Sequence, residues 1–256
     1  MVYRHKKILE YLTEKDDAAV SELSDLLNVT EVTIRSDLTK LSEEKKVIRS
    51  HGRVSLLGER IKAENSFDAR KKQNLAQKVK IGKTAVNLIN SNDTFLLDSS
   101  STVLTLASAI RERSELKEVT AIPTGIWAAI ELMGINDVNV LLPGGYLRNV
   151  SGSIIGLPTT EFLSGLNIQK AFLGAWGISA EKGFMDSHLQ EIELKKYIIK
   201  CAEEVIILAD GSKFGQLGLA AYANIENVTT LITDNTAPKE ILNKIKNRGI
   251  EIIIAD

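Results

Sequence analysis

Apolar residues near the start of the chain recur every three or four positions, the spacing of helices with one buried face. Three successive segments show this pattern, with apolar stripes at Ile8, Leu9 and Leu12, then Val20, Leu23, Leu26 and Leu27, then Ile34, Leu38 and Leu41. We expect the third helix to begin at Thr30, whose hydroxyl can cap it. Short β-like runs around His51-Gly52 then predict a hairpin. Three helices and a hairpin predict a winged helix-turn-helix over residues 1–57.

A different pattern follows this small domain. Residues 58–74 are highly charged and are expected to form a linker. Residues 75–256 alternate short apolar runs such as "TFLLD" and "EVIILAD" with helical stretches such as "TVLTLASAIRER". Strands that alternate with helices are typical of a mainly parallel sheet flanked by helices on both faces. The chain is therefore predicted to be an α/β protein with a small N-terminal winged helix-turn-helix and a body built on a mainly parallel sheet.

Composition narrows the protein classes that are possible. Of 256 residues, 44% are apolar and 25% charged, which is typical of a globular protein. The N-terminus lacks the apolar core of a signal peptide, and no apolar run has the length of a membrane helix, so we expect a cytoplasmic protein. The single cysteine, Cys201, excludes an internal disulfide. The three histidines are scattered along the sequence, so we expect no metal site and no cofactor.

Charge is unevenly distributed along the chain. Residues 1–80 contain 17 Lys and Arg against 13 Asp and Glu, a balance of +4, and the remainder contains 15 against 20, a balance of −5. A basic front on an acidic body fits a head that binds an anionic partner such as nucleic acid. The pattern is weak by itself, because charged residues also cover ordinary solvated surfaces.

The third helix has a polar face that can bind DNA. Opposite its apolar stripe lie Thr33, Arg35, Ser36, Thr39 and Lys40. In a helix-turn-helix this helix enters the major groove, where Arg binds guanine and hydroxyls reach bases or phosphates. His51 and Arg53 at the hairpin tip suit a wing that contacts backbone phosphates or the minor groove. A solvated face, or a face for protein contacts, remains the alternative. The candidate DNA-binding residues are Thr30, Thr33, Arg35, Ser36, Lys40, His51 and Arg53.

This region resembles the N-terminal helix-turn-helix of DeoR-family transcriptional regulators. The "TIRSDLTKL" core and the trailing "IRSHG" carry the resemblance together. It implies that the recognition-helix signature comprises Thr33, Ile34, Arg35, Asp37 and Leu38. The family usually has a second arginine where this chain has Ser36, which implies one phosphate or base contact fewer.

Four polar or glycine-rich stretches follow predicted strands of the second domain. In open α/β sheets, ligands bind beyond the carboxyl ends of the strands. Hydroxyls and backbone N–H groups at a helix start favour anions, glycines allow close backbone approach, and Arg or Lys can pair with a phosphate. Each stretch alone could be a helix cap or a turn, but together they predict a site for a small phosphorylated molecule. The candidate residues are Ser99, Ser100, Ser101, Thr102, Thr124, Gly125, Gly144, Gly145, Arg148 and Lys213.

The resemblance to the DeoR family extends over this second domain. The segments "LLDSSSTVLTLA", "PGGYLR", "FLGAWGIS", "LQEIELKK" and "ILADGSKFG" are similar to the family's C-terminal effector domain. That domain is similar in fold to ribose-5-phosphate isomerase and typically senses sugar phosphates or related metabolites. The resemblance implies ligand-binding roles for Asp98, Ser101, Thr102, Gly144, Gly145, Glu191 and Lys213.

An isomerase fused to a helix-turn-helix is the main alternative. Aldose–ketose proton transfer needs a positioned carboxylate base and a group that stabilises the enediolate. The isomerase-like enzymes carry aspartates in the loop that corresponds here to "LGAWGIS", where Trp176 stands instead. Trp176 could close over a ligand or pack in the core. We therefore expect a sensor rather than an enzyme.

Together these patterns predict a sequence-specific DNA-binding regulator. We expect a repressor of a metabolic operon, controlled by a small phosphorylated metabolite of the sugar phosphate type. Because one modestly basic helix-turn-helix binds DNA weakly, a homodimer or homotetramer that reads paired half-sites is expected.

Overall fold

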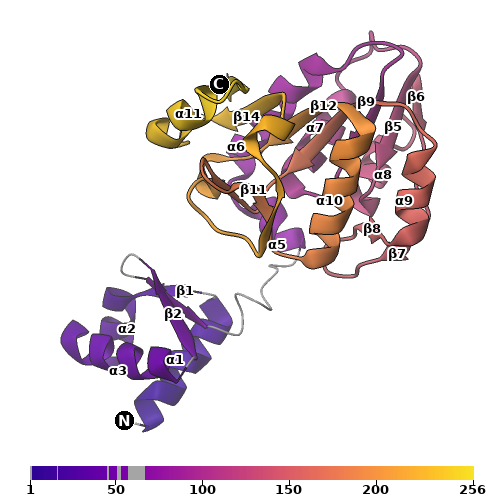
Figure 1. Ribbon diagram of the computed structural model, residues 1–256. Coiled ribbons are helices and arrows are strands. Elements are labelled where there is room, and N and C mark those ends of the chain that lie inside the picture. Colours follow the sequence, from indigo (N-terminus) through magenta and orange to yellow (C-terminus); the bar gives the residue numbers. More distant parts are fainter. Residues whose placement is uncertain (1, 16, 45, 51–52, 57–66) are drawn as a thin grey trace. The chain divides into compact units, whose positions relative to one another are not determined.

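A computed structural model describes residues 2–15, 17–44, 46–50, 53–56 and 67–256 of the chain. The chain divides into two compact units, residues 1–65 and residues 66–256 (Figure 1). The second unit therefore begins within the stretch that the sequence predicts to be a linker, because helix α5 (Phe67–Lys72) belongs to it. In the part of the chain that the structure describes, no helix has both the length and the apolar character needed to cross a membrane.

The first unit is the predicted winged helix-turn-helix. Its elements are α1 (Val2–Lys15), β1 (Asp17–Ala19), α2 (Val20–Leu27), α3 (Glu31–Glu43), β2 (Val47–Ser50) and β3 (Arg53–Leu56). The predicted apolar stripes meet in one core, in which Ile8, Leu23 and Ile34 are fully buried. Strands β2 and β3 form the predicted antiparallel hairpin, and β1, which the sequence did not reveal, adds a third strand beside β3.

The turn between α2 and α3 fixes the start of the recognition helix. Asn28 ends α2 in the left-handed region, with φ of 49°, a conformation that asparagine tolerates better than most residues. The Thr30 side chain then accepts a hydrogen bond from the backbone N–H of Thr33 at 3.3 Å. This confirms Thr30 as the cap of the third helix.

The second unit is built on a seven-stranded parallel sheet with the order β15-β14-β12-β9-β4-β5-β6. The strands are β4 (Thr94–Leu97), β5 (Val119–Pro123), β6 (Val138–Val140), β9 (Ile168–Gly174), β12 (Ala202–Leu208), β14 (Thr230–Asp234) and β15 (Glu251–Ala255). Side chains alternate between the faces: Leu96 packs into one core, and Phe95 and Leu97 pack into the other. Both faces are apolar because helices cover both, as the sequence predicts.

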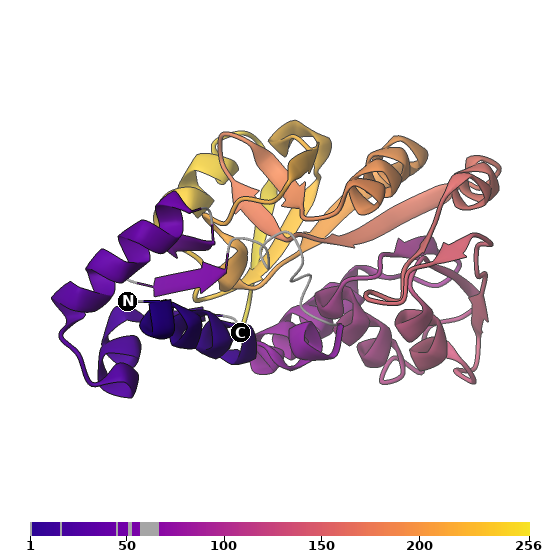
Figure 2. The same cartoon turned by 90° about the horizontal axis from the view of Figure 1, so that it is seen from below.

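Helices of the second unit are divided between the two faces of the sheet (Figures 1 and 2). One core contains side chains of α6 (Leu75–Ala85), α7 (Ser101–Ile110) and α8 (Ile126–Leu132). The other contains side chains of α9 (Leu157–Ser164), α10 (Leu189–Cys201) and α11 (Lys239–Lys246). The 3-10 turns are η1 (Val86–Leu88), η2 (Gly211–Lys213) and η3 (Ile225–Asn227).

Two small sheets extend from this frame. Strands β10 (Gly177–Ser179), β11 (Gly183–Asp186) and β13 (Ala220–Ala223) form an antiparallel sheet. Strands β7 (Tyr146–Leu147) and β8 (Ile154–Ile155) form a short hairpin. Both lie beyond the main sheet and carry side chains toward its carboxyl edge.

Neighbouring strands β4 and β9 mark the point where the strand order reverses. From β4 the chain proceeds outward to β5 and β6, then returns to β9 on the other side of β4 and proceeds outward again to β12, β14 and β15. Ligands of open α/β sheets bind at such a switch point, beyond the carboxyl ends of the two strands. The residues that follow β4 and β9 therefore lie where a ligand of such a sheet is expected to bind.

Candidate functional site

The outward face of α3 is as the sequence predicts. Ile34, Leu38 and Leu41 are fully buried, whereas Arg35 and Lys40 are exposed. Arg35 pairs with Glu31 one turn earlier, Nη2 to Oε2 at 3.0 Å, on the surface of the helix. Ser36 and Thr39 are exposed as well, and Thr33 is half-buried. The helix thus presents hydroxyls and two cations on one accessible face.

The buried side of α3 holds a charged anchor that fixes this helix. The Asp37 carboxylate is buried and accepts hydrogen bonds from Arg4 and His5 of α1. The distance between His5 Nε2 and Asp37 Oδ1 is 3.2 Å. Burial favours the neutral acid, but the hydrogen bonds and charges of Arg4 and His5 outweigh it and hold the pKa of Asp37 below its ordinary value. Asp37 therefore ties α3 to α1, and the opposite face of the helix stays exposed.

Of the two predicted wing residues, the structure describes one. Arg53 begins β3, where it pairs in register with Ser50. His51 lies outside the described residues, so its predicted role stays a prediction.

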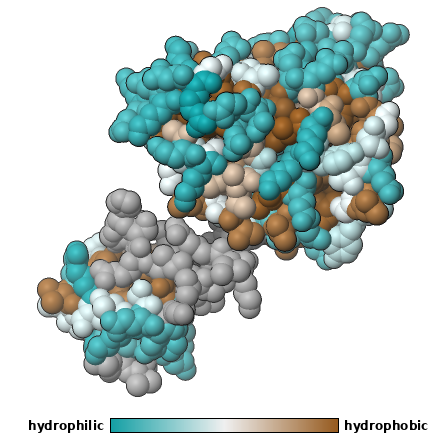
Figure 3. Space-filling view, viewed as in Figure 1, coloured by the Kyte–Doolittle hydropathy of each residue, from teal (hydrophilic) through white to brown (hydrophobic). Residues whose placement is uncertain are grey.

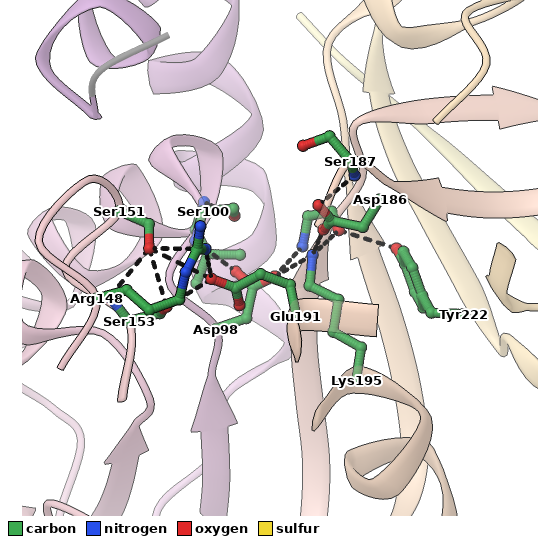
Figure 4. Close-up of polar contacts among 12 residues, drawn as sticks. Asp98, Ser100, Arg148, Ser151, Ser153, Asp186, Ser187, Glu191, Lys195 and Tyr222 are labelled. Atoms are coloured by element: carbon green, nitrogen blue, oxygen red, sulfur yellow. Dashed lines mark hydrogen bonds and ion pairs between the residues drawn. The ribbon is translucent and has the colours of Figure 1, made fainter. Parts of the chain in front are cut away.

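At the switch point, the Asp98 carboxylate joins the ends of β4 and β9 (Figure 4). One oxygen accepts the backbone N–H of Ser100 at 2.8 Å, and the other accepts that of Gly174 at 2.7 Å. A side chain on Gly174 would collide with Ser100, 2.4 Å from the position of a Cβ, so only glycine allows this close approach. Asp98 thus sets the position of Ser100, whose hydroxyl caps α7 by accepting the N–H of Val103 at 3.2 Å.

Lys195 of α10 connects two carboxylates at the same edge. Its ammonium lies 2.6 Å from Asp186, 3.1 Å from Asp98 and 2.8 Å from the carbonyl oxygen of Gly174. Burial would lower the pKa of Lys195, but the charges of Asp186 and Asp98 raise it well above its ordinary value. The ammonium donates to Asp186 and to the Gly174 carbonyl oxygen and forms an ion pair with Asp98, so Lys195 holds both carboxylates in place.

Tyr222 of β13 completes this group. Its hydroxyl donates to the Gly174 carbonyl oxygen at 2.9 Å, and its ring lies 4.9 Å from the ammonium of Lys195. Burial raises the pKa of the Tyr222 hydroxyl, so the side chain stays a neutral donor. The ring also shields the ammonium from solvent on one side.

One helical turn before Lys195, Glu191 forms a second buried group (Figure 4). Its Oε1 accepts from Arg148 Nη1 at 2.6 Å and from the hydroxyls of Ser151 and Ser153. Arg148, which the sequence suggests as a cation for the ligand, is therefore committed to an ion pair with Glu191. The pair joins α10 to the loop between β7 and β8.

A cationic group lies beyond the carboxyl end of β12. Lys213 Nζ lies 5.7 Å from the centre of the Trp176 ring, and the charges of Asp210, Arg70 and Asp186 act on it. Burial is the main cause that lowers the pKa of Lys213. Lys78 of α6 belongs to the same group, because the charges of Asp210, Lys213 and Arg70 act on its ammonium.

Lys78 is the least expected member of this cationic group. Its ammonium is buried and donates to the backbone oxygens of Arg70 and Gln73, at 2.7 Å for Gln73. Burial lowers the pKa of Lys78 to about 8. Helix α7 packs beside the backbone of Lys78, because the Thr105 hydroxyl donates to the Lys78 carbonyl oxygen at 2.6 Å.

Asp210 is the carboxylate among these cations. Its Oδ1 accepts from Asn74 at 2.8 Å and from the backbone N–H of Ser212 at 3.1 Å. Its Oδ2 is buried and has no hydrogen-bond partner among the described residues. A buried carboxylate oxygen without a partner is costly, and a hydroxyl of a bound molecule can satisfy it.

Other predicted ligand residues lie at the same edge but play different parts. Thr124 is buried and its N–H donates to the Leu97 carbonyl oxygen at 2.8 Å, while Gly125 approaches Ser99 so closely that a Cβ would lie 2.8 Å from its Cα. The Gly144 carbonyl oxygen accepts from Thr159, and a Cβ on Gly145, whose φ is +151°, would collide with the Thr159 hydroxyl. Ser99 is half-buried, and Ser101 and Thr102 are buried in the first turn of α7.

Sequence reasoning missed several residues of these groups. Arg70 and Lys78 fall in a helical, highly charged stretch where lysines and arginines are common, so nothing marks them. Lys195 lies four residues after Glu191, a spacing that puts both on one face of α10 and could have drawn attention. Tyr222, Ser151 and Ser153 are joined to the site only by contacts between distant parts of the sequence. Within the described ranges, no group of three or more His, Cys, Asp or Glu side chains could hold a metal ion.

Comparisons with known proteins match both units. Residues 4–60 match the family model of the DeoR-like helix-turn-helix domain, and residues 73–235 match that of the DeoR C terminal sensor domain. The chain is 33% identical over 253 residues to the HTH-type transcriptional regulator GolR of Listeria innocua, across 99% of this chain and 98% of that protein. It is 27% identical over 249 residues to the Glycerol-3-phosphate regulon repressor of Escherichia coli, across 97% of each.

Among solved structures, ribose 5-phosphate isomerase A from Methanocaldococcus jannaschii is similar to part of the chain. The two are 21% identical, with a TM-score of 0.42 over 56% of this chain and 55% of that one.

Proposed function

The chain belongs to the DeoR family of transcriptional regulators, and we propose that it represses a metabolic operon under the control of a small phosphorylated metabolite. The observation that carries the effector half of this proposal is the cationic group of Arg70, Lys78 and Lys213 around Asp210. The charges that act on Lys213 are those of Asp210, Arg70 and Asp186, and Asp186 is already paired with Lys195, so positive charge is in excess beside Lys213 and Lys78 in a largely buried place. A phosphate would balance that excess.

The DNA half of the proposal rests on α3. Its exposed face offers Arg35 and Lys40 together with the hydroxyls of Ser36 and Thr39, while Asp37 anchors the opposite side to α1. An arginine on such a helix can bind a guanine through two parallel hydrogen bonds, worth about 1–3 kcal/mol of discrimination. The Glu31 pair of Arg35 is exposed and therefore costs little to break.

The site also offers groups that can bind the hydroxyls of a ligand. Ser101 and Thr102 lie in the first turn of α7, where backbone N–H groups favour an anion or a polar oxygen. Asp210 Oδ2 offers an acceptor for a hydroxyl of the same ligand. Cations beside a carboxylate that can accept a hydroxyl suit a sugar phosphate or another phosphorylated polyol. The name of one relative, the Glycerol-3-phosphate regulon repressor, agrees with this chemistry.

We propose a regulator and not an isomerase. Asp98 and Asp186 are the carboxylates at the switch point, and Lys195 binds both. Both Asp98 oxygens also accept backbone N–H groups, so Asp98 is held as part of the frame rather than placed as a base. The two curated relatives described above are named as a regulator and a repressor.

Control by the effector requires that it bind two states of the protein unequally, since a ligand with equal affinity for both shifts nothing. The first test is a thermal-shift panel in which each sugar phosphate is matched with its unphosphorylated sugar. A ligand that binds only the native state raises the melting temperature. The proposal predicts that a phosphorylated compound raises it and its unphosphorylated twin does not. The proposal is contradicted if a phosphorylated compound and its unphosphorylated sugar have equal effects, or if no phosphorylated compound has any effect. Isomerisation of any compound in the panel would instead support the isomerase alternative.

A further inference from the structure

The sensor domain, residues 66–256, carries a large apolar surface that the effector site does not use. Its members come from α8, the β7–β8 hairpin and the first residue of α9, and we call them the hairpin face. They are Trp127, Ile130, Met133, Tyr146, Leu147, Val150 and Leu157, with 43–69% of each residue exposed. Figure 3 shows apolar side chains gathered along the lower margin of this domain, including the lower end of α9.

Contacts between distant segments join the parts of this face. The Trp127 ring stacks on Phe67, with centroids 5.7 Å apart, and the Phe67 N–H donates to the Val150 carbonyl oxygen at 3.2 Å. Gly152 lies against Trp127, where a Cβ would come within 2.5 Å of the indole nitrogen. Strand β8, with Ile154 opposite Leu147, then joins the turn to Tyr146 and Leu147. Helix α8 and the hairpin therefore present one connected surface.

The size of the hairpin face fits a stable interface. The two aromatic side chains have areas of roughly 150–250 Å² each, and with the five large aliphatic ones, all about half exposed, they leave an apolar area of several hundred Å². The largest apolar patch on a typical monomer is about 300–600 Å². A standard interface buries about 800 Å² on each partner. The hairpin face is thus comparable to the largest patches that monomers expose and to the area that one partner contributes to a complex.

The charge of this region indicates which partner covers it. Residues 138–160 contain one charged residue, Arg148, although a quarter of the whole chain is charged. Arg148 is buried against Glu191, so this stretch presents no exposed charge. Helix α8 adds one charged residue, the half-buried Glu131. Cores of protein interfaces are depleted in charge, and a face with so few charges can meet its own copy with little repulsion. DNA or a strongly charged partner would require charges that the stretch lacks.

We propose that a second copy of this chain docks on the hairpin face and forms a two-fold symmetric dimer. In such a dimer the same surface of each copy faces the other. A regulator with a single helix-turn-helix needs two copies to read two half-sites, which gives the pairing a purpose. The proposal does not depend on the identity of the effector, because it concerns a surface outside the effector site.

The hairpin also connects this interface with the buried groups of the site. Leu147 and Val150 are exposed, whereas Arg148, Ser151 and Ser153 between and after them are buried and bind Glu191. A shift of Glu191 or of the loop would therefore move residues of the dimer interface. This places the interface where it can respond to events at the switch point.

Sedimentation velocity of the full chain at micromolar concentrations tests the proposal, with Tyr146→Lys and Val150→Lys as interface variants. Ile254→Lys on β15 and Leu219→Lys before β13 change other exposed apolar residues in the same way. Thermal unfolding verifies that each variant is folded. We expect a wild-type dimer, at least about tenfold weaker dimers in the two hairpin variants, and unchanged dimers in the two controls.

Three results would overturn the proposal. The first is a wild-type chain that stays monomeric. The second is hairpin variants that are folded and dimerise as the wild type does. The third is a dimer that is lost only in Leu219→Lys, because that would place the interface elsewhere. None of these measurements uses DNA or an effector, so their failure is distinguishable from failure of the proposed regulatory function.

Discussion

Arg148 Nη1 lies 2.6 Å from Oε1 of Glu191, and both side chains are buried. The two residues are 43 positions apart, one in the loop of the β7–β8 hairpin and the other on α10. Ser151 and Ser153 donate to the same carboxylate oxygen. The ion pair therefore attaches the hairpin to the helix that also carries Lys195.

Loss of this pair should destabilise the sensor domain. Removal of one partner of a buried ion pair leaves an uncompensated charge and costs about 3–5 kcal/mol. We expect Glu191→Ala to lower the free energy of unfolding by that amount, measured by urea unfolding. Tryptophan fluorescence reports this domain selectively, because Trp127 and Trp176 are the only tryptophans of the chain. The control is Glu193→Ala, an exposed glutamate on the same helix. Equal stability of the two variants would contradict a structural role of the pair.

Arg35 is expected to carry base recognition. Arg35→Ala should weaken binding to a selected operator by about 1–3 kcal/mol and relax the preference at one base position. Fluorescence anisotropy with operator DNA and single-base variants measures both effects. Lys6→Ala, an exposed cation on α1 with the same charge change, is the control. Uniform weakening on every sequence would make Arg35 a phosphate contact instead.

Ser36 offers a gain of function. It is exposed beside Arg35 on α3, at the position where the DeoR family usually has a second arginine. Ser36→Arg should strengthen DNA binding and steepen its salt dependence by about one unit, because an added phosphate contact releases one more counterion. Titrations at several salt concentrations check this. An unchanged slope would show that this position does not reach the DNA.

Lys78 predicts how effector binding depends on pH. Burial lowers the pKa of Lys78 to about 8, and a bound phosphate would raise it. Above about pH 8, where the Lys78 amine of the free protein is mostly neutral, binding of the phosphate therefore takes up a proton. Affinity should be constant between about pH 7 and pH 8, where the phosphate is a dianion, and fall by up to about tenfold per pH unit above pH 8. Calorimetric titration across this range measures the decline, which Lys78→Arg should flatten because arginine stays charged. A wild-type affinity that does not change above pH 8 would remove Lys78 from the site.

The sequence was sufficient for the elements that repeat a simple period. The stripes that include Ile34 and Leu38 predicted the helices of the head, and alternating strands and helices predicted the parallel sheet with polar loops at its carboxyl edge. Strand β1, only three residues long, and α5, hidden in a charged stretch, were missed because neither is long enough to show a period.

The site was harder to predict because its contacts join distant residues. Arg148 was predicted as a free cation for the ligand, since nothing in the sequence reveals that Glu191 binds it. The separation between Tyr222 and Gly174 is 48 residues, and that between Asn74 and Asp210 is 136. Local patterns indicate which residue types lie at a sheet edge, but only the packed structure shows which of them bind one another and which face a ligand.

The most direct test of the regulatory account is effector-dependent release of operator DNA by the wild type and by Lys213→Ala. The assay is fluorescence anisotropy, with the phosphorylated compound found in the thermal-shift panel and its unphosphorylated twin. We expect this compound alone to change wild-type DNA affinity, and Lys213→Ala to bind DNA normally but to lose that response. A Lys213→Ala variant that responds at wild-type effector concentrations, or a wild type that ignores every phosphorylated compound, would contradict the account.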